Sequence, residues 1–344
     1  MTIRELARLA GVSHATVSRA LNDNPRLSLK TRERIQALAK KHEYQPHPLV
    51  SKLMVQLAHI KTINRSTLAL VTSFKDPLSP FLLEVYEGIK ERVKVLGYKL
   101  EEFPLSAYKM SCSRLSDVLY ARGIEGVIIF PLQKSPGHLS LKWPRFTSVA
   151  IGRTLACPPL HRVSFSHFEN MVLALRHMHK LGYQRIAMAI ESRLHSRGGD
   201  AYIAAFCLYQ RTIPQKDRVP ILVRPVIHAA ETADWLRKYR ADSILCNYSP
   251  TPRQLKSEGF DIPGRLGYVT LDRYPGSEHV TGIEQNPRYV GVAAVDQLTA
   301  HLHRNERGIP PFPKLTVIQG EWIEAKTVKK LSPHTHLRHV QKIE

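Results

Sequence analysis

Apolar residues near the amino terminus recur at intervals of three and four, the spacing of one face of a helix. The first such stretch covers residues 2–10 and ends at Gly11. Ser13 follows in a position suited to cap the next stretch, and a third runs from about residue 28 to about residue 42. The pattern predicts three short helices, the first two joined by a turn that contains glycine. This order is the helix-turn-helix arrangement.

After about residue 62 the pattern changes, because short apolar runs alternate with longer stretches of helical spacing. The runs typical of strands cover residues 68–71, 126–130, 148–151, 185–190, 243–246 and 266–271. The helical stretches cover residues 81–95, 168–180, 202–209, 232–239 and 288–302. Such alternation predicts parallel sheets with helices on both faces, and the chain is long enough for two of them. Ligands of these sheets bind at the carboxyl ends of the strands, in the crevice between lobes.

Composition favours a globular protein with a polyanionic partner. The 344 residues are 43% apolar, and 50 Lys and Arg against 29 Asp and Glu leave a net charge of +21. Residues 1–60 hold +6 of this excess, so the segment is about twice as charge-dense as the rest. The charge is consistent with nucleic-acid binding, but a basic surface without that role stays open as an alternative.

The four cysteines, Cys112, Cys157, Cys207 and Cys246, are widely spaced and form no metal-binding pattern. We expect them to be reduced and mostly buried, as in a cytosolic protein. The first residues contain no apolar core of a signal peptide, and no run of eighteen apolar residues occurs. We therefore expect a cytoplasmic protein that is not inserted into a membrane.

The second helix has an outward face suited to reading DNA. Its outward positions are occupied by His14, Ala15, Thr16, Ser18 and Arg19. Arg19 can bind guanine through two hydrogen bonds, Ala15 can contact a thymine methyl group, and His14 can bond to base edges. The hydroxyl groups of Ser13, Thr16 and Ser18 suit phosphate oxygens. The pattern alone leaves open an ordinary helical hairpin with a polar solvent face.

The same segment resembles the DNA-binding headpiece of the LacI/GalR family. The resemblance covers the run from Ile3 to Asn22, the run from Ser28 to Ile35, and Tyr44-Gln45-Pro46. It implies that His14, Ala15 and Arg19 read bases in double-stranded operator DNA. It also implies contacts to the DNA backbone from Ser13, Thr16, Ser18, Asn22, Ser28 and Thr31.

The family resemblance further implies a hinge after the third helix. In that family the segment folds on DNA into a short helix that inserts a leucine into the minor groove. Here Pro48 suits a first helical turn and Leu53 matches the inserted residue. Val50 replaces the usual alanine between paired hinge helices, and Met54 occupies a position often used for minor-groove contact. Core packing of Leu53 and Met54 is the alternative.

The later part of the chain resembles the two-lobed, periplasmic-binding-protein-like core of the same family. The matching segments are Pro80-Phe81 with Gly88, residues 181–187, residues 266–272 and residues 281–285. The resemblance implies that an effector is bound by Ser73, Phe81, Arg197, Asn247, Asp272 and Gln285. A carboxylate, amides, a guanidinium and an aromatic face together suit a carbohydrate.

Two alternatives and two departures qualify this effector site. Arg197 stands before two glycines and could be a surface charge, and Asp272 could cap a turn. Ser79 replaces an asparagine that is common before Pro-Phe, and Asn247 is followed by Tyr248 rather than by aspartate. The identity of the effector therefore stays open.

Other classes of protein fit less well. The dinucleotide, phosphate-loop, nucleophile-elbow and zinc-protease motifs are all absent, which argues against an enzyme. A solute-binding protein would lack the headpiece, and an architectural DNA-binding protein would show little sequence preference. His334, His336 and His339 could suggest a metal, but a solvated basic tail explains them better.

The sequence thus predicts an all-α helix-turn-helix headpiece and an α/β two-lobed sensor. We divide the chain into headpiece 1–46, hinge and linker 47–61, core 62–327 and basic tail 328–344. The expected function is a homodimeric transcriptional regulator, a repressor, that binds a pseudopalindromic operator and responds to a small molecule. No catalytic residue, cofactor or metal site is expected.

Overall fold

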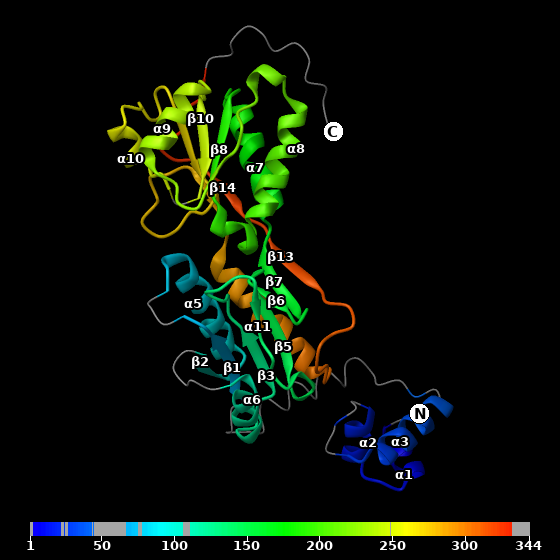
Figure 1. Cartoon of the computed structure of the whole chain (residues 1–344). Coiled ribbons are helices and arrows are strands. Elements are labelled where there is room, and N and C mark those ends of the chain that lie inside the picture. The colour runs from blue at the N-terminus through cyan, green and yellow to red at the C-terminus, as the bar shows by residue number, and fades with distance from the viewer. Residues whose placement is uncertain are drawn as a thin grey trace.

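The computed structural model describes residues 3–21, 24, 27–42, 44, 67–74, 78–105, 111–247 and 249–331, without the side chains of residues 194–196. These residues form a unit of three helices and two α/β lobes (Figure 1). The predicted fold class is confirmed, with α-helices alone at the amino terminus and mixed layers of helix and sheet afterwards.

The amino-terminal unit consists of α1 (Ile3–Ala10), α2 (His14–Leu21) and α3 (Leu29–Lys41). Each helix turns its apolar face inward, so that Leu6, Val17 and Ile35 are fully buried in one shared core. This is the outcome that the spacing of apolar residues predicted for all three helices.

The ends of the first two helices are held by the third. Arg34 donates from Nη2 to the carbonyl of Ala10 at 3.0 Å, and Gln36 donates from Nε2 to the carbonyl of Ala20 at 3.0 Å. Both carbonyls lie in last helical turns, where no intrahelical donor is available. Gly11 has a φ of +63°, which lets the chain turn sharply from α1 toward α2.

The first lobe is built on a six-stranded parallel sheet in the order β13-β7-β5-β3-β1-β2. Its strands are β1 (Thr67–Thr72), β2 (Lys99–Pro104), β3 (Gly126–Ile129), β5 (Thr147–Ile151), β7 (His161–Phe165) and β13 (Leu315–Ile318). Helices α5 (Pro80–Val95) and α11 (Pro287–His303) pack on one face, and α6 (Cys112–Ala121) packs on the other.

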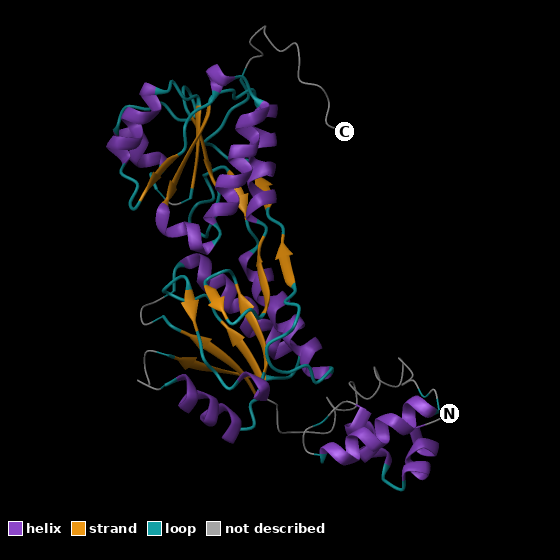
Figure 2. Cartoon of the chain, turned by 45° about the vertical axis from the view of Figure 1, so that its right-hand side comes forward, coloured by secondary structure: helices purple, strands orange, loops and turns teal. Residues whose placement is uncertain are grey.

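The second lobe repeats this architecture with the order β14-β12-β11-β10-β8-β9. Its strands are β8 (Ile186–Glu191), β9 (Leu222–Arg224), β10 (Ser243–Cys246), β11 (Gly267–Thr270), β12 (Gly282–Glu284) and β14 (Glu321–Ile323), of which β14 is antiparallel. Helices α7 (His167–Lys180) and α8 (Gly199–Thr212) cover one face, and α9 (Ala229–Lys238) and α10 (Pro252–Ser257) cover the other (Figure 2).

Smaller elements complete both lobes. A two-stranded sheet joins β4 (Gly137–His138) to β6 (Leu155–Cys157). Short 3₁₀ helices cover Trp143–Arg145, Ser192–Arg197 and Gln215–Asp217.

The chain passes between the lobes at residues 165–167, 284–287 and 318–321. These crossings are bonded to one another and to α7. Asn286 donates from Nδ2 to the carbonyl of Gln319 at 3.1 Å, and the Gly320 N–H donates to Asn170 Oδ1 at 2.9 Å. The crossings therefore lie together in one connection between the lobes, which is the arrangement of a hinge in two-lobed proteins.

Every strand and helix predicted from apolar spacing is present, with ends that differ by up to about three residues. The pattern missed α6, α10 and several strands, among them β2, β7 and β14. In β2 the sequence Lys-Leu-Glu-Glu-Phe-Pro places charged residues on an exposed edge strand. Such short edge strands expose much of their surface and so need few apolar residues.

The expectation of mostly buried cysteines is wrong. Cys246 is buried, but Cys112 is only partly buried and Cys157 and Cys207 are exposed, and all four are unpaired. Cys157 lies at the end of the short strand β6, and Cys207 lies on the outer side of α8. Spacing along the chain carries no information on which side of these elements faces the solvent.

Residues at the start of the expected basic tail are bound to the second lobe. Val328 is buried, the Lys329 N–H donates to Tyr183 Oη at 3.1 Å, and the Leu331 N–H donates to the carbonyl of Leu181 at 2.7 Å. The tail histidines lie outside the described residues. No helix in the described part of the chain is long and apolar enough to cross a membrane.

Candidate functional site

The second helix presents the side chains that the sequence proposed as base readers. His14, Ala15 and Arg19 are exposed on α2, whereas Val17 and Ala20 of the same helix are fully buried. Thr16 and Ser18 are partly buried at its margins. Because the buried residues fix the rotation of α2, the three exposed side chains share one outward surface.

Two matched pairs of hydroxyl residues cap the second and third helices. Ser13 Oγ accepts a hydrogen bond from the Thr16 N–H at 3.2 Å and lies 2.9 Å from Thr16 Oγ1. Ser28 Oγ likewise accepts from the Thr31 N–H at 3.3 Å and lies 2.8 Å from Thr31 Oγ1. Helix amino termini with exposed hydroxyl groups are favourable places for phosphate oxygens.

Four of the proposed DNA-contacting residues are outside the described part of the chain. These are Asn22, Val50, Leu53 and Met54. Their roles, and the hinge over 47–61, stay predictions.

A cleft of about 1240 Å³ lies between the two lobes. It is lined by residues that follow the carboxyl ends of β1, β3, β5 and β7 in the first lobe and of β8 to β12 in the second. Loops follow the carboxyl ends of parallel strands, and ligands of such sheets usually bind at this edge. The proposed effector residues on its wall are Phe81, Arg197, Asn247, Asp272 and Gln285.

Ser73 is not among the residues that line this cleft. Its Oγ accepts a hydrogen bond from the Gln133 N–H at 2.8 Å, and the carbonyl of Gln133 accepts a hydrogen bond from Arg197 Nη2. Ser73 thus holds the loop after β3, and Arg197 reaches that loop from the other lobe. The structure makes Ser73 a support for the cleft wall.

The second lobe contributes a buried polar wall made of Asn247, Asp272 and Gln285. Asn247 Nδ2 donates to Asp272 Oδ2, Tyr202 Oη donates to Asp272 Oδ1 at 3.4 Å, and Gln285 Nε2 donates to the carbonyl of Leu271 at 3.1 Å. Asn247 Oδ1 and Gln285 Oε1 are buried without a hydrogen-bond partner. Burial raises the pKa of Asp272 to about 6, although bonds from Asn247 and Tyr202 oppose the rise.

Aromatic rings cover the opposite wall. Phe81 packs against Phe165 with ring centroids 4.9 Å apart, and His167 lies edge to face with both Phe165 and Tyr202. Such rings offer apolar faces to a ligand, whereas the buried wall offers hydrogen-bond acceptors. A carbohydrate has both kinds of surface.

The sequence did not identify several cleft residues, namely Lys134, Arg153, His167, Arg193 and Tyr202. Arg153 and Arg193 each stand two or three residues after a predicted strand, so their position was a usable signal. His167 follows β7, a strand that the apolar pattern missed. Ser79 also lines the cleft and caps α5, since its Oγ accepts from the Leu82 N–H at 3.4 Å.

Protonation of His167 is expected to destabilise the protein below neutral pH. Burial lowers the pKa of His167 from 6.5 to about 4, and the charge of Arg153 adds to this effect. Between pH 6.5 and pH 4 the unfolded state therefore binds more protons than the folded state. The contribution of neutral His167 to the free energy of unfolding is complete above about pH 6.5 and falls by about 3 kcal/mol as the pH falls toward 4. Thermal unfolding of the wild type and of His167→Gln from pH 7 to pH 4 measures this loss of stability.

The difference between the two proteins isolates His167 from other groups. The raised pKa of Asp272 acts in the opposite direction, since it favours the folded state at low pH, and it is present in both proteins. The wild type should lose more stability than His167→Gln as the pH falls. Parallel curves of stability against pH for the two proteins would show that protonation of His167 does not destabilise the folded state.

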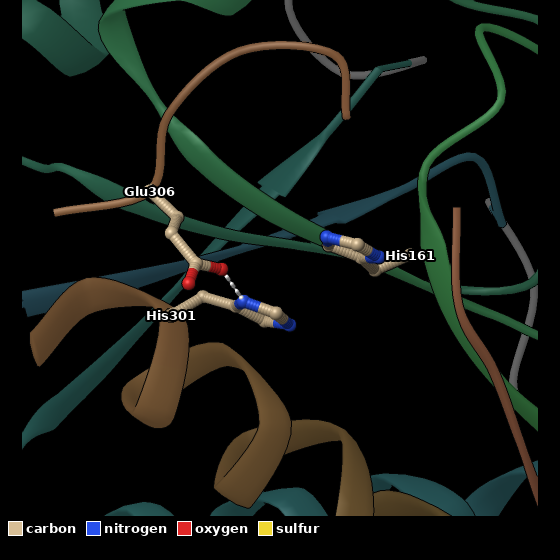
Figure 3. A group of neighbouring side chains, drawn as sticks. All are labelled: His161, His301 and Glu306. Carbon is tan, nitrogen blue, oxygen red and sulfur yellow. Dashed lines mark hydrogen bonds and ion pairs between the residues drawn. The ribbon is translucent and has the colours of Figure 1, made fainter. Parts of the chain in front are cut away.

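A second cluster lies outside the cleft, where His161 of β7, His301 of α11 and Glu306 meet (Figure 3). The two imidazole rings are stacked, with centroids 4.3 Å apart and planes 3° from parallel. His301 Nδ1 is bonded to Glu306, whose carboxylate is also bound by Arg304. Arg304 and then His301 lower the pKa of Glu306 to about 2.

These three residues could offer ligand atoms within 4.8 Å of one another, but the geometry is not that of a metal centre. His161 Nδ1 already accepts a hydrogen bond from the Lys314 N–H at 2.9 Å, which assigns the proton of a neutral ring to Nε2. Because the two rings are parallel, the lone pairs of their nitrogen atoms lie in parallel planes and do not point toward one metal position. We interpret the cluster as a structural stack that joins β7, α11 and the chain after it.

Comparison with known proteins gives the same picture for the headpiece. Residues 2–47 match the family model described as bacterial regulatory proteins, lacI family. Over 340 residues the chain is 25% identical to the HTH-type transcriptional regulator PtxS of Pseudomonas aeruginosa, covering 93% of this chain and 95% of that protein.

Two solved structures share the fold of nearly the whole chain. One is the lac repressor dimer bound to operator and the anti-inducer ONPF, with 20% identity, a TM-score of 0.57, and coverage of 96% of this chain and 99% of that one. The other is a complex of the transcriptional regulator CelR with cellobiose, with 19% identity, a TM-score of 0.57, and coverage of 95% and 99%.

Proposed function

We propose that this chain, whose residues 2–47 match the model of the lacI family of bacterial regulatory proteins, is a transcriptional repressor of that family that binds a pseudopalindromic operator as a homodimer. A small molecule bound between the lobes would control its affinity for DNA. The chain would act without catalysis, and the divisions 1–46, 47–61, 62–327 and 328–344 would correspond to headpiece, hinge, core and tail, of which residues 328–331 pack on the second lobe.

The observation that carries the proposal is the exposed set His14, Ala15 and Arg19 on the capped helix α2. In a helix-turn-helix domain, side chains near the start of the second helix contact base edges in the major groove. The hydroxyl pairs at Ser13 and Ser28 would bind phosphates on either side and so orient the helix.

The cleft supports a carbohydrate effector. Its buried acceptors on Asn247 and Gln285 suit hydroxyl donors, and Phe81 with Phe165 offers an apolar face. One of the solved structures with this fold is a complex of a transcriptional regulator with cellobiose, which supports a carbohydrate as the ligand class.

The bond from Arg197 to the carbonyl of Gln133 suggests how a ligand would act. This bond joins the lobes across the cleft, so a ligand that competes with it or adds to it would change the angle between them. In a dimer that change would alter the spacing of the two hinges and, with it, operator affinity.

Arg19→Ala is expected to reduce both affinity and discrimination for the operator. An arginine that forms two hydrogen bonds to guanine contributes about 1–3 kcal/mol, so each half-site should lose about tenfold to hundredfold in affinity. The operator would be selected from random DNA with the wild-type protein. Anisotropy titrations against single-base mismatches would then measure the loss for each position.

The control is Arg211→Ala, which removes the same charge from an exposed position of α8. It should leave affinity and mismatch penalties unchanged. Equal discrimination by Arg19→Ala and the wild type would show that α2 does not read bases. Selected DNA without dyad symmetry would contradict the homodimer.

A further inference from the structure

The cleft between the lobes is lined by more positive charge than a neutral sugar needs. Lys134 and Arg153 project from the first lobe, and Arg193 and Arg197 come from the second. Within the described residues, Asp272 is the only carboxylate that lines this cleft. Cations from both lobes therefore line one cleft.

Contacts inside the protein compensate this charge only in part. Glu191, which is buried behind the wall, is bonded to Arg193, and Arg197 is bonded to the carbonyl of Gln133. Among the described residues, Arg153 and Lys134 form no ion pair. Even with Asp272 fully ionised and Glu191 included, Lys134, Arg153 and Arg193 leave a net charge of +1, without counting Arg197.

The repulsion among these groups reaches His167. The charge of Arg153 is one of the causes that lower the pKa of that imidazole. A site that repels a further positive charge attracts an anion by the same field.

The buried polar wall has the opposite requirement. Asn247 Oδ1 and Gln285 Oε1 lack partners, and both are acceptors that an anionic oxygen cannot satisfy. Asp272 is also an acceptor when it is ionised. This wall therefore needs hydroxyl donors, whereas the cationic groups need an anionic oxygen.

We propose that the effector is a polyhydroxylated anion, a sugar that carries a carboxylate or a phosphate group. This inference rests on the proposed function, because it names the ligand class of the same cleft. Hydroxyl groups of the ligand contact Asn247, Asp272 and Gln285, and its anionic group lies among Arg153, Arg193 and Lys134. The anion lowers the repulsion between cations of opposite lobes, so its binding favours a closed cleft.

The test is a binding screen on the full-length protein. Five- and six-carbon aldonic acids and sugar phosphates are compared with their neutral parent sugars, and inorganic phosphate is included as the anion without hydroxyl groups. Thermal shift identifies ligands and isothermal titration measures their Kd. Comparison of the aldonic acids with the sugar phosphates shows which anionic group the protein binds.

We expect at least one acidic sugar to bind at least tenfold more tightly than both its neutral parent and inorganic phosphate. Its affinity should fall as salt is raised. The proposal is overturned if the neutral parent binds as tightly, if inorganic phosphate binds as tightly, or if no acidic sugar of the panel binds.

Variants locate the anionic group. Arg153→Gln should raise the Kd of the acidic sugar by about tenfold or more, because it removes a hydrogen bond to a charged group. Arg114→Gln removes an exposed charge on α6 outside the cleft and should leave the Kd unchanged. An unchanged Kd in Arg153→Gln would contradict the assignment of this residue to the anion.

The two proposals fail separately. Sequence-specific DNA binding is measured without sugar and with each ligand of the panel, so its absence under all of these conditions would contradict the proposed function alone. Preference for a neutral sugar in a protein that still selects an operator would contradict the anionic ligand alone.

Discussion

Gly291→Val is expected to lower the free energy of unfolding by about 3 kcal/mol or more, because the first lobe has no space for a side chain at this position. A Cβ atom on Gly291 would lie 2.1 Å from the carbonyl oxygen of Val85 and 2.8 Å from the Ile89 backbone nitrogen. Both atoms belong to the backbone of α5 and cannot rotate away. The substitution therefore forces α5 and α11 apart.

The approach is tight from both sides, since a Cβ atom on Gly88 would lie 2.0 Å from the carbonyl oxygen of Arg288. Thermal unfolding of the full chain should show a midpoint lower by about 10 °C for Gly291→Val. Val292→Ile adds a carbon at the next, half-buried position of α11 and serves as the control. A midpoint equal to that of the control would show that the two helices can move apart at little cost.

Leu6→Ala is expected to abolish specific DNA binding while leaving ligand binding intact. Leu6 is fully buried among Val17, Ile35 and their neighbours, and truncating such a leucine costs about 2–5 kcal/mol. A unit of about forty residues buries too little apolar surface to absorb this loss. Operator affinity, measured by anisotropy, should fall by more than about hundredfold, beyond the loss of a single base contact.

Leu9→Ala is the matched control, since Leu9 lies on the same helix and is 54% exposed. It should keep operator affinity close to that of the wild type. The cleft should bind its ligand equally well in both variants, because none of the headpiece residues that the structure describes lines it. Normal operator affinity in Leu6→Ala would mean that the three helices hold together without this core.

The spacing of apolar residues was sufficient to predict the main elements. Val17 and Ala20 recur at helical intervals, so their burial determines that His14, Ala15 and Arg19 face outward. The uninterrupted apolar runs of β3, β8 and β10 are typical of strands covered on both faces. These predictions succeeded because each depends on neighbours close in the sequence.

The site in the cleft was only partly predictable. Asn247, Asp272 and Gln285 were proposed from family resemblance, and the structure brings them together on one wall. Ser73 was proposed on the same basis, yet its hydroxyl is used to hold the loop at Gln133. A resemblance assigns positions, whereas hydrogen bonds to distant segments decide which atoms remain available to a ligand.

The sequence by itself determined that a capped helix with outward-facing His14, Ala15 and Arg19 precedes two α/β lobes, because these features depend on local spacing and capping. Only the tertiary structure decided the charge of the cleft. Lys134, Arg153, Arg193 and Arg197 come from loops of different lobes, and parallel sheets bring those loops together at the ends of their strands. The pairing of Glu191 with Arg193, and the lack of such a partner at Arg153 in the described chain, likewise depend on contacts in space.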